Sequence, residues 1–114
     1  MSRVGVLFTR SGWRGVDSAV GIDTALAALA FEHEVDVAFV GAGVELLVRG
    51  DSSDERAQRE RMIAALLHHG ARSLRASSDC LERRALVPHV SGVEQMPLSA
   101  LHAWLAGVDH VVCF

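Results

Sequence analysis

The chain has 114 residues, a length typical of one domain, and half of its residues are apolar, which argues against a disordered chain. Its formal net charge of -3 offers no excess of positive charge for a phosphate backbone, so direct nucleic-acid binding is not expected. All eleven basic residues are arginine, which excludes the lysine of a P-loop and the amine of a Schiff base.

The first half of the chain alternates between strand and helix patterns. Residues 4–8 form an apolar run that predicts a buried strand, and the turn-rich loop TRSGWRG follows it. Asp17 or Ser18 is expected to cap a helix, which carries apolar residues at helical spacing and ends at Phe31. Residues 35–40 predict a second strand, which the following GAG ends.

The second half of the chain continues this alternation. Ser52 or Ser53 is expected to cap a helix with an apolar stripe, and Gly70 stands where the C-terminus of that helix favours glycine. Shorter elements follow: a strand at 71–76, a helix with Asp79 and Glu82 as its capping box, a strand at 90–95, a helix at 98–105 and a strand at 108–114. Five alternations predict an α/β fold, in which helices cover both faces of a parallel sheet, as a single domain over residues 1–114.

The first helix is apolar on every side between residues 25 and 31. A helix that is apolar all round is normally buried, so another subunit is expected to cover one face of it. The alternative is that its alanines are tolerated on a solvent-exposed surface.

The location expected for the chain is cytoplasmic. Its first residues lack the charged and apolar regions of a signal peptide, and residues 25–31 are too few to span a membrane, which takes about 20. Two cysteines, Cys80 and Cys113, make no disulfide framework, and neither belongs to a CxxC metal motif.

Several motifs resemble ligand sites only weakly. The loop at residues 9–15 follows the first strand and has the hydroxyls and glycines to hold a phosphate or a flavin. Residues 41–46 carry two of the three glycines of a dinucleotide fingerprint, and the simpler interpretation is a turn at the end of a strand. The six histidines form no HxxxH or HExxH pair, so no metal site is expected at His33, His68, His69, His89, His102 or His110.

The two cysteines have different expected roles. Cys113 lies in the apolar last strand and is expected to be a buried structural thiol. Cys80 would be the first residue of a helix capped by Asp79, a position that favours thiolate, but the charges of Asp79 and Glu82 oppose it. The less favoured alternative is a helix that begins earlier, with Ser77 as its cap.

The order and spacing of several segments resemble the TusC/DsrF branch of the DsrE/DsrF/DsrH family over essentially the whole chain. The most specific segments are FVGAGVELLVRG after the second strand, LERRAL before Pro88, and the terminal VVCF. The resemblance implies a three-layer α/β/α domain whose five-stranded parallel sheet has the strand order 4-3-2-1-5.

The resemblance also implies a hetero-oligomer that relays persulfide sulfur and needs no cofactor. The implied partners are paralogous TusB/DsrH-like and TusD/DsrE-like subunits, with a TusE/DsrC-like protein as a further sulfur acceptor. One branch of the family serves 2-thiouridine formation at the tRNA wobble position and the other serves dissimilatory sulfur oxidation, and the chain does not distinguish them.

In the family the sulfur-bearing cysteine belongs to the TusD/DsrE subunit and follows the third strand. Matching that motif by its helix end places the position at Ser77, with Cys80 three residues later, and Ala42 stands where the family has an acidic residue. The expected function is therefore a scaffold subunit that is not an enzyme on its own. The alternatives are a stand-alone persulfide carrier that uses Cys80, and a small flavin- or phosphate-binding domain that uses residues 9–15.

Overall fold

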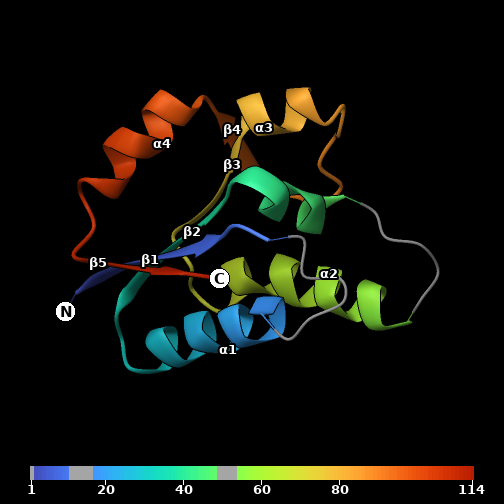
Figure 1. Ribbon diagram of the computed structural model, residues 1–114. Coiled ribbons are helices and arrows are strands. Elements are labelled where there is room, and N and C mark those ends of the chain that lie inside the picture. Colours follow the sequence, from blue (N-terminus) through green and yellow to red (C-terminus); the bar gives the residue numbers. More distant parts are fainter. Residues whose placement is uncertain (1, 11–16, 49–53) are drawn as a thin grey trace.

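A computed structural model describes residues 2–10, 17–48 and 54–114. Strands and helices alternate along these residues as the sequence predicts (Figure 1). The elements are β1 (Arg3–Phe8), α1 (Asp17–Ala30), β2 (Glu34–Phe39), the 3-10 helix η1 (Gly41–Leu47), α2 (Asp54–His68), β3 (Ser73–Ser77), α3 (Ser78–Arg83), β4 (Val93–Met96), α4 (Leu98–Leu105) and β5 (His110–Cys113). The predicted caps Ser52 and Ser53 lie outside the described residues.

The five strands form one parallel sheet in the order β4-β3-β2-β1-β5. This arrangement confirms the predicted fold class and strand order. Helices α1 and α2 lie on one side of the sheet and α4 lies on the other, so the molecule has three layers (Figure 1). Parallel strands need such covered faces because their crossover helices pack back onto the sheet.

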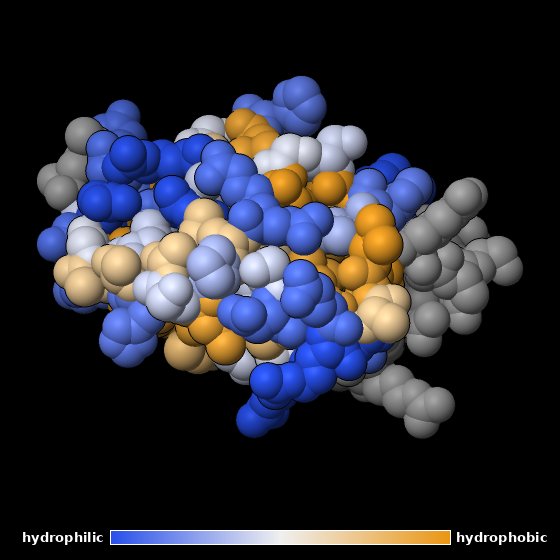
Figure 2. All heavy atoms as spheres, turned by 90° about the horizontal axis from the view of Figure 1, so that it is seen from above, coloured by the Kyte–Doolittle hydropathy of each residue, from blue (hydrophilic) through white to orange (hydrophobic). Residues whose placement is uncertain are grey.

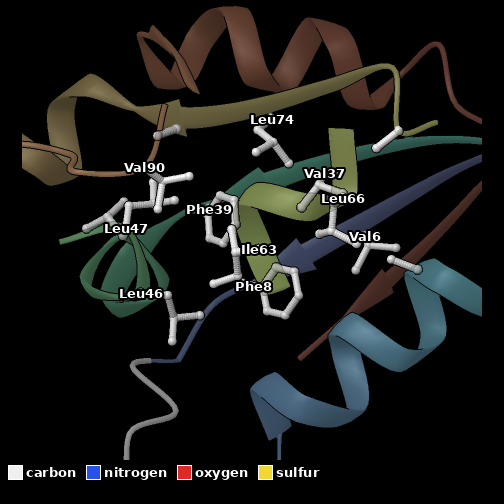
Figure 3. Close-up of a cluster of buried hydrophobic side chains, with 14 of the residues drawn as sticks. Val6, Phe8, Val37, Phe39, Leu46, Leu47, Ile63, Leu66, Leu74 and Val90 are labelled. Atoms are coloured by element: carbon white, nitrogen blue, oxygen red, sulfur yellow. The ribbon is translucent and has the colours of Figure 1, made fainter. Parts of the chain in front are cut away.

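The main core lies between the sheet and helices α1 and α2. Phe8 at the end of β1 and Phe39 at the end of β2 stack with their ring centroids 5.1 Å apart, as Figure 3 shows among the surrounding apolar side chains. The 3-10 helix η1 packs beside them, and Gly43 makes this approach possible. A Cβ atom built on Gly43 would lie 1.9 Å from the backbone oxygen of Phe8, which leaves no room for any other residue.

Three helices end in the same hydrogen-bonded turn. After α2, Gly70 has a φ of +107°, and the N–H of Ala71 donates to the carbonyl oxygen of Leu66, as expected for a C-terminal glycine. After α1 and α3, residues with a side chain, Glu32 and Ala85, take the corresponding left-handed conformation with φ values of 65° and 53°.

Replacing Ala85 with glycine is therefore expected to raise the free energy of unfolding by about 0.5–1 kcal/mol. Glycine adopts a positive φ without the steric cost that a Cβ atom brings, and Ala85 is exposed and loses no packing. Chemical denaturation of the two proteins measures the difference. Replacing the exposed Ala100 within α4 with glycine is the control, and it is expected to lower the free energy of unfolding instead.

The last strand differs from its prediction. The sequence predicts a strand at 108–114 with a buried thiol at Cys113, but β5 is an edge strand, with Val111 44% exposed and Cys113 exposed as well. The reason is that the apolar contacts of α4 reach β1 and β2 rather than β5, since the buried cluster on that face contains Leu7 and Ala38. The expectation of a buried structural thiol at Cys113 is therefore wrong.

The apolar first helix is buried on one side only. Ala25 is fully buried against the sheet, whereas Ala27 and Ala30 are exposed and Phe31 is 78% exposed. The outer surface of residues 25–31 is thus apolar, whereas Asp23 is exposed earlier in the helix. The prediction that another subunit covers one face of the helix stays a prediction. Among the described residues, no helix has the length and apolar character needed to cross a membrane.

Candidate functional site

The junction between β3 and α3 holds the residues that the family resemblance singles out. Ser77 is the last residue of β3 and is 0% exposed, and its Oγ accepts a hydrogen bond from the backbone N–H of Cys80 at 3.1 Å. Ser77 is therefore the N-cap of α3, and the predicted capping box of Asp79 and Glu82 is wrong. Ser77 takes this role because it is already extended at the strand end and its buried hydroxyl needs a partner.

Asp79 has a different role from the one predicted. Its Oδ2 atom accepts a hydrogen bond from the backbone N–H of Leu98 at 2.8 Å, so it satisfies an N–H in the first turn of α4. This hydrogen bond thus links the first turn of α3 to the first turn of α4.

Cys80 lies in the first turn of α3 and is 7% exposed. Its Sγ atom accepts a hydrogen bond from the backbone N–H of Gly41 at 3.3 Å. Gly41 begins η1 with a φ of +56°, a conformation that glycine adopts without strain. The thiol is therefore enclosed at the carboxyl ends of β2 and β3, and it packs with the main core.

Cys113 is the last residue of β5, the strand at the edge of the sheet opposite β4. It is exposed, and with Thr9, Arg10 and Phe114 it lines a hollow of about 220 Å³. Strands β2 and β1 lie between β3, which leads to Cys80, and β5. The three spacings between neighbouring strands place the ends of β3 and β5 about 14 Å apart. A disulfide needs Cα atoms within about 7 Å, so Cys80 and Cys113 cannot form one within a single chain.

The two thiols are expected to react with a thiol reagent at very different rates. Cys113 is exposed and should react within the time of mixing, whereas Cys80 is enclosed and should react at least about tenfold more slowly, through opening of the structure. Labelling of the native protein with a chromogenic disulfide measures both rates, and Cys113→Ser assigns them. Equal rates in the native protein would show that Cys80 is accessible.

The loop proposed for flavin or phosphate binding is only partly described. Residues 11–15 of this prediction lie outside the described residues. The hydroxyl of Thr9 donates a hydrogen bond to the backbone oxygen of Phe114 at 2.8 Å, and the backbone N–H of Thr9 donates to the same oxygen. Thr9 is thus already used to hold β1 against the end of the chain.

The histidines are dispersed over the fold. Nδ1 of His33 accepts a hydrogen bond from the N–H of Ser2, and Nε2 of His89 lies 3.2 Å from the carboxylate of Glu60. Within residues 2–10, 17–48 and 54–114, no three histidine, cysteine or acidic side chains lie together as a metal site would need. Ala42, which stands where the family resemblance implies an acidic residue, lies half-buried in η1.

One polar cluster was missed by the sequence analysis. Asp36 in β2 is 1% exposed, and its carboxylate accepts hydrogen bonds from Ser73 at 2.9 Å, Arg3 at 3.1 Å and Arg75 at 3.3 Å. The guanidinium of Arg75 also lies 5.0 Å from the centroid of the Trp104 ring in α4. The signal for this cluster was the carboxylate of Asp36 between the apolar residues of β2.

The electrostatics of this cluster favour the ionised form of Asp36. Burial raises the pKa of its carboxyl, but hydrogen bonds from Ser73 and Arg3, the nearby N–H of Trp104 and the positive charge of Arg75 lower it by more. The pKa of Asp36 therefore lies below the usual value of 3.8. The cluster lies towards the amino ends of the strands, away from Ser77 and Cys80, and so it is not part of the β3–α3 junction.

Comparison with known proteins agrees with this architecture. The crystal structure of the ychN protein from E. coli has a TM-score of 0.86 with this chain at 19% identity, over 100% of both chains. A conserved protein of unknown function from Bacteroides thetaiotaomicron has a TM-score of 0.70 at 18% identity, over 99% of this chain and 95% of that one. At such identities these likenesses show the fold alone.

The sequence itself matches a family model. No curated protein matches the chain at a significant level. The model of the DsrE/DsrF-like family, however, matches residues 2–114, which is nearly the whole chain. The chain therefore belongs to the DsrE/DsrF-like family.

Proposed function

We propose that the chain is a subunit of a persulfide-relay complex, in which it supports a thiol-bearing paralogue rather than carrying sulfur itself. Membership of the DsrE/DsrF-like family supports a role in sulfur transfer. The partners in this proposal are TusB/DsrH-like and TusD/DsrE-like subunits, and the chain itself takes the TusC/DsrF position. The sulfur serves either tRNA 2-thiouridine formation or sulfur oxidation.

The observation that carries the scaffold role is the state of Ser77. The family resemblance aligns Ser77, the last residue of β3, with the sulfur-bearing cysteine of TusD/DsrE subunits. Its hydroxyl is fully buried and caps α3. In persulfide transfer an acceptor thiolate attacks the outer sulfur of a donor persulfide, a new S–S bond forms, the old one breaks, and the donor leaves as a thiolate. The capping hydroxyl of Ser77 cannot take part in this exchange.

Cys80, the nearest thiol, is poorly placed to replace it. An incoming persulfide must approach the sulfur along a free path, and Cys80 is enclosed between α3 and η1. Its hydrogen bond from Gly41 and its contacts with the main core are those of a structural thiol.

A carrier role for Cys80 is the second candidate, and one observation favours it. Cys80 lies in the first turn of α3, and the backbone N–H of Gly41 points at its sulfur. A donor at this place stabilises a thiolate, and the charge of Asp79 is held by the N–H of Leu98. This candidate requires α3 or η1 to move before sulfur can reach Cys80.

Co-expression with the two paralogous subunits tests the proposal. The chain is expected to purify with both as one hetero-oligomer, because its exposed apolar surface on α1 favours association. Under persulfide loading, intact-mass analysis is expected to find the added sulfur on the TusD/DsrE-like subunit. A chain that stays monomeric with both partners present would contradict the proposed complex, and added sulfur on Cys80 would support the second candidate.

A further inference from the structure

The two faces of the sheet are covered very differently. On the side of α1 and α2, a large apolar cluster runs from Val6 to Val90 (Figure 3). On the side of α4, the buried cluster formed by described residues consists of Leu7, Ala38 and Leu101. Figure 2 looks onto this side of the molecule and shows hydrophilic residues interspersed with hydrophobic ones.

The sheet surface beneath α4 is largely charged or polar. Side chains alternate between the faces of a strand, so Asp36 shares its face with Ala38, and Ser73 and Arg75 share a face of β3. The hydrogen bonds between Asp36, Ser73 and Arg75 show that these side chains lie together. A parallel sheet is normally apolar on both faces, and this one departs from that rule only on the α4 side.

Helix α4 is held to this surface by a few separate contacts. Its one buried residue is Leu101, and near its C-terminus the ring of Trp104 lies against the guanidinium of Arg75. Arg3 donates a hydrogen bond to the carbonyl oxygen of Gly107, just after the helix, and Asp79 accepts one from Leu98 at its start. The polar contacts exchange readily with water because they are partly exposed.

Two buried donors in this region lack a hydrogen bond of normal geometry. Nε of Arg3 has only Oε2 of Glu34 at 3.9 Å, and Nε1 of Trp104 has only a weak interaction with the carboxylate of Asp36. An unpaired buried donor destabilises the packed state relative to one in which water reaches it. Separation of α4 from the sheet hydrates both atoms. The apolar packing that it breaks is limited to Leu101 and the partly buried Trp104 and Leu105, which is much less than the cluster on the other face of the sheet contains.

We propose that α4 is a strap that releases from the sheet as a unit while the rest of the fold stays intact. The strap pivots between Pro97 and Gly107, which flank it, and strands β4 and β5 stay paired at its two ends. Release uncovers the polar surface of Asp36, Ser73 and Arg75. The stacking of Arg75 on Trp104 is the contact that keeps the strap closed.

Native-state hydrogen exchange of the full chain, followed by mass spectrometry at increasing denaturant, tests this inference. Amides of α4 are expected to exchange at least about 100-fold faster than those of α2 and β2, with little dependence on denaturant, as local opening requires. Arg75→Gln is expected to speed exchange in α4 by about a further tenfold relative to α2, the size expected for loss of one cation–π contact. Arg72→Gln is the matched control. Arg72 lies in the same stretch and pairs with Glu34 rather than α4, so exchange in α4 should not change.

Two outcomes would overturn the inference. Exchange of α4 amides at the rate and denaturant dependence of α2 would show that the helix opens only when the whole domain unfolds. Fast local exchange that is unaffected by Arg75→Gln would show that Arg75 does not hold the strap. Trp104→Leu removes the same contact from the other side and serves as a second variant if Arg75→Gln does not fold, with the same outcomes expected.

Discussion

Replacing Asp36 with asparagine is expected to lower the free energy of unfolding at pH 7 by about 3 kcal/mol. The carboxylate is buried and pairs with Arg3 and Arg75, and removing one partner of a buried ion pair costs about 3–5 kcal/mol. The lower end of this range applies because the side chains of Arg3 and Arg75 are 32% and 20% exposed, so water partly solvates their charges when the carboxylate is removed.

The effect of Asp36→Asn is also expected to depend on pH. The folded-state pKa of Asp36 is lowered, so its carboxyl binds a proton less readily in the folded than in the unfolded protein. The stability that it contributes is therefore complete above the unfolded-state value of about 3.9 and is lost as the pH falls through the lower folded-state value. Chemical denaturation of both proteins between pH 7 and pH 3 measures this loss.

Glu34→Gln is the control for this prediction. Glu34 lies two residues earlier in β2 and pairs with Arg72, but its side chain is 43% exposed. Exposed pairs contribute about 0–1 kcal/mol, so a small effect is expected. A cost for Asp36→Asn no larger than that for Glu34→Gln would show that the Asp36 cluster adds little to stability.

Replacing Gly43 with alanine is expected to destabilise the protein by about 3 kcal/mol or more. The new Cβ atom would lie 1.9 Å from the backbone oxygen of Phe8 and 3.0 Å from the backbone nitrogen of Thr9, and backbone atoms cannot rotate away as side chains do. Relief requires η1 to move away from the end of β1, which separates Leu46 and Leu47 from the core. Against a total stability of about 5–15 kcal/mol this is a large loss.

Gly107→Ala is the matched control for Gly43→Ala. A Cβ atom at Gly107 would meet its nearest neighbours at 3.5 and 3.6 Å, an ordinary contact distance, and so the change is expected to cost less than about 0.5 kcal/mol. Thermal unfolding of both variants compares them directly. If the two substitutions have equal effects, then η1 adjusts freely and its approach to β1 is not constrained.

The architecture was predictable because its signals are local and repeat along the chain. The apolar runs of β1 and β2, the helical spacing in α1 and the glycine after α2 identify these elements. The predicted bounds of the weaker elements differ from the observed ones by a few residues. The predicted strand at 90–95, for example, is Val93–Met96, because Val90 instead packs into the core beside Leu47.

The candidate site was less predictable because it depends on contacts between distant segments. Ser77, Ser78 and Asp79 are all suitable caps by residue type, and only the burial of Ser77 at the end of β3 decides between them. The partner of Asp79 is Leu98, which lies 19 positions away, and the partner of Cys80 is Gly41, which lies 39 positions away. Cys113 was placed in the correct strand, but its burial was mispredicted because the sequence does not show that α4 leaves β5 uncovered.

Transfer of labelled persulfide sulfur through the reconstituted complex tests the scaffold role most directly. Cys80→Ser is expected to leave the transfer rate within about twofold of the wild type, since the thiol is enclosed and serine is similar in shape and can accept the N–H of Gly41. Cys113→Ser is the control for the exposed thiol, and loss of the cysteine in the TusD/DsrE-like partner is expected to abolish transfer. A loss of tenfold or more with Cys80→Ser, in a complex that still assembles, would contradict the scaffold role and make this chain a sulfur carrier.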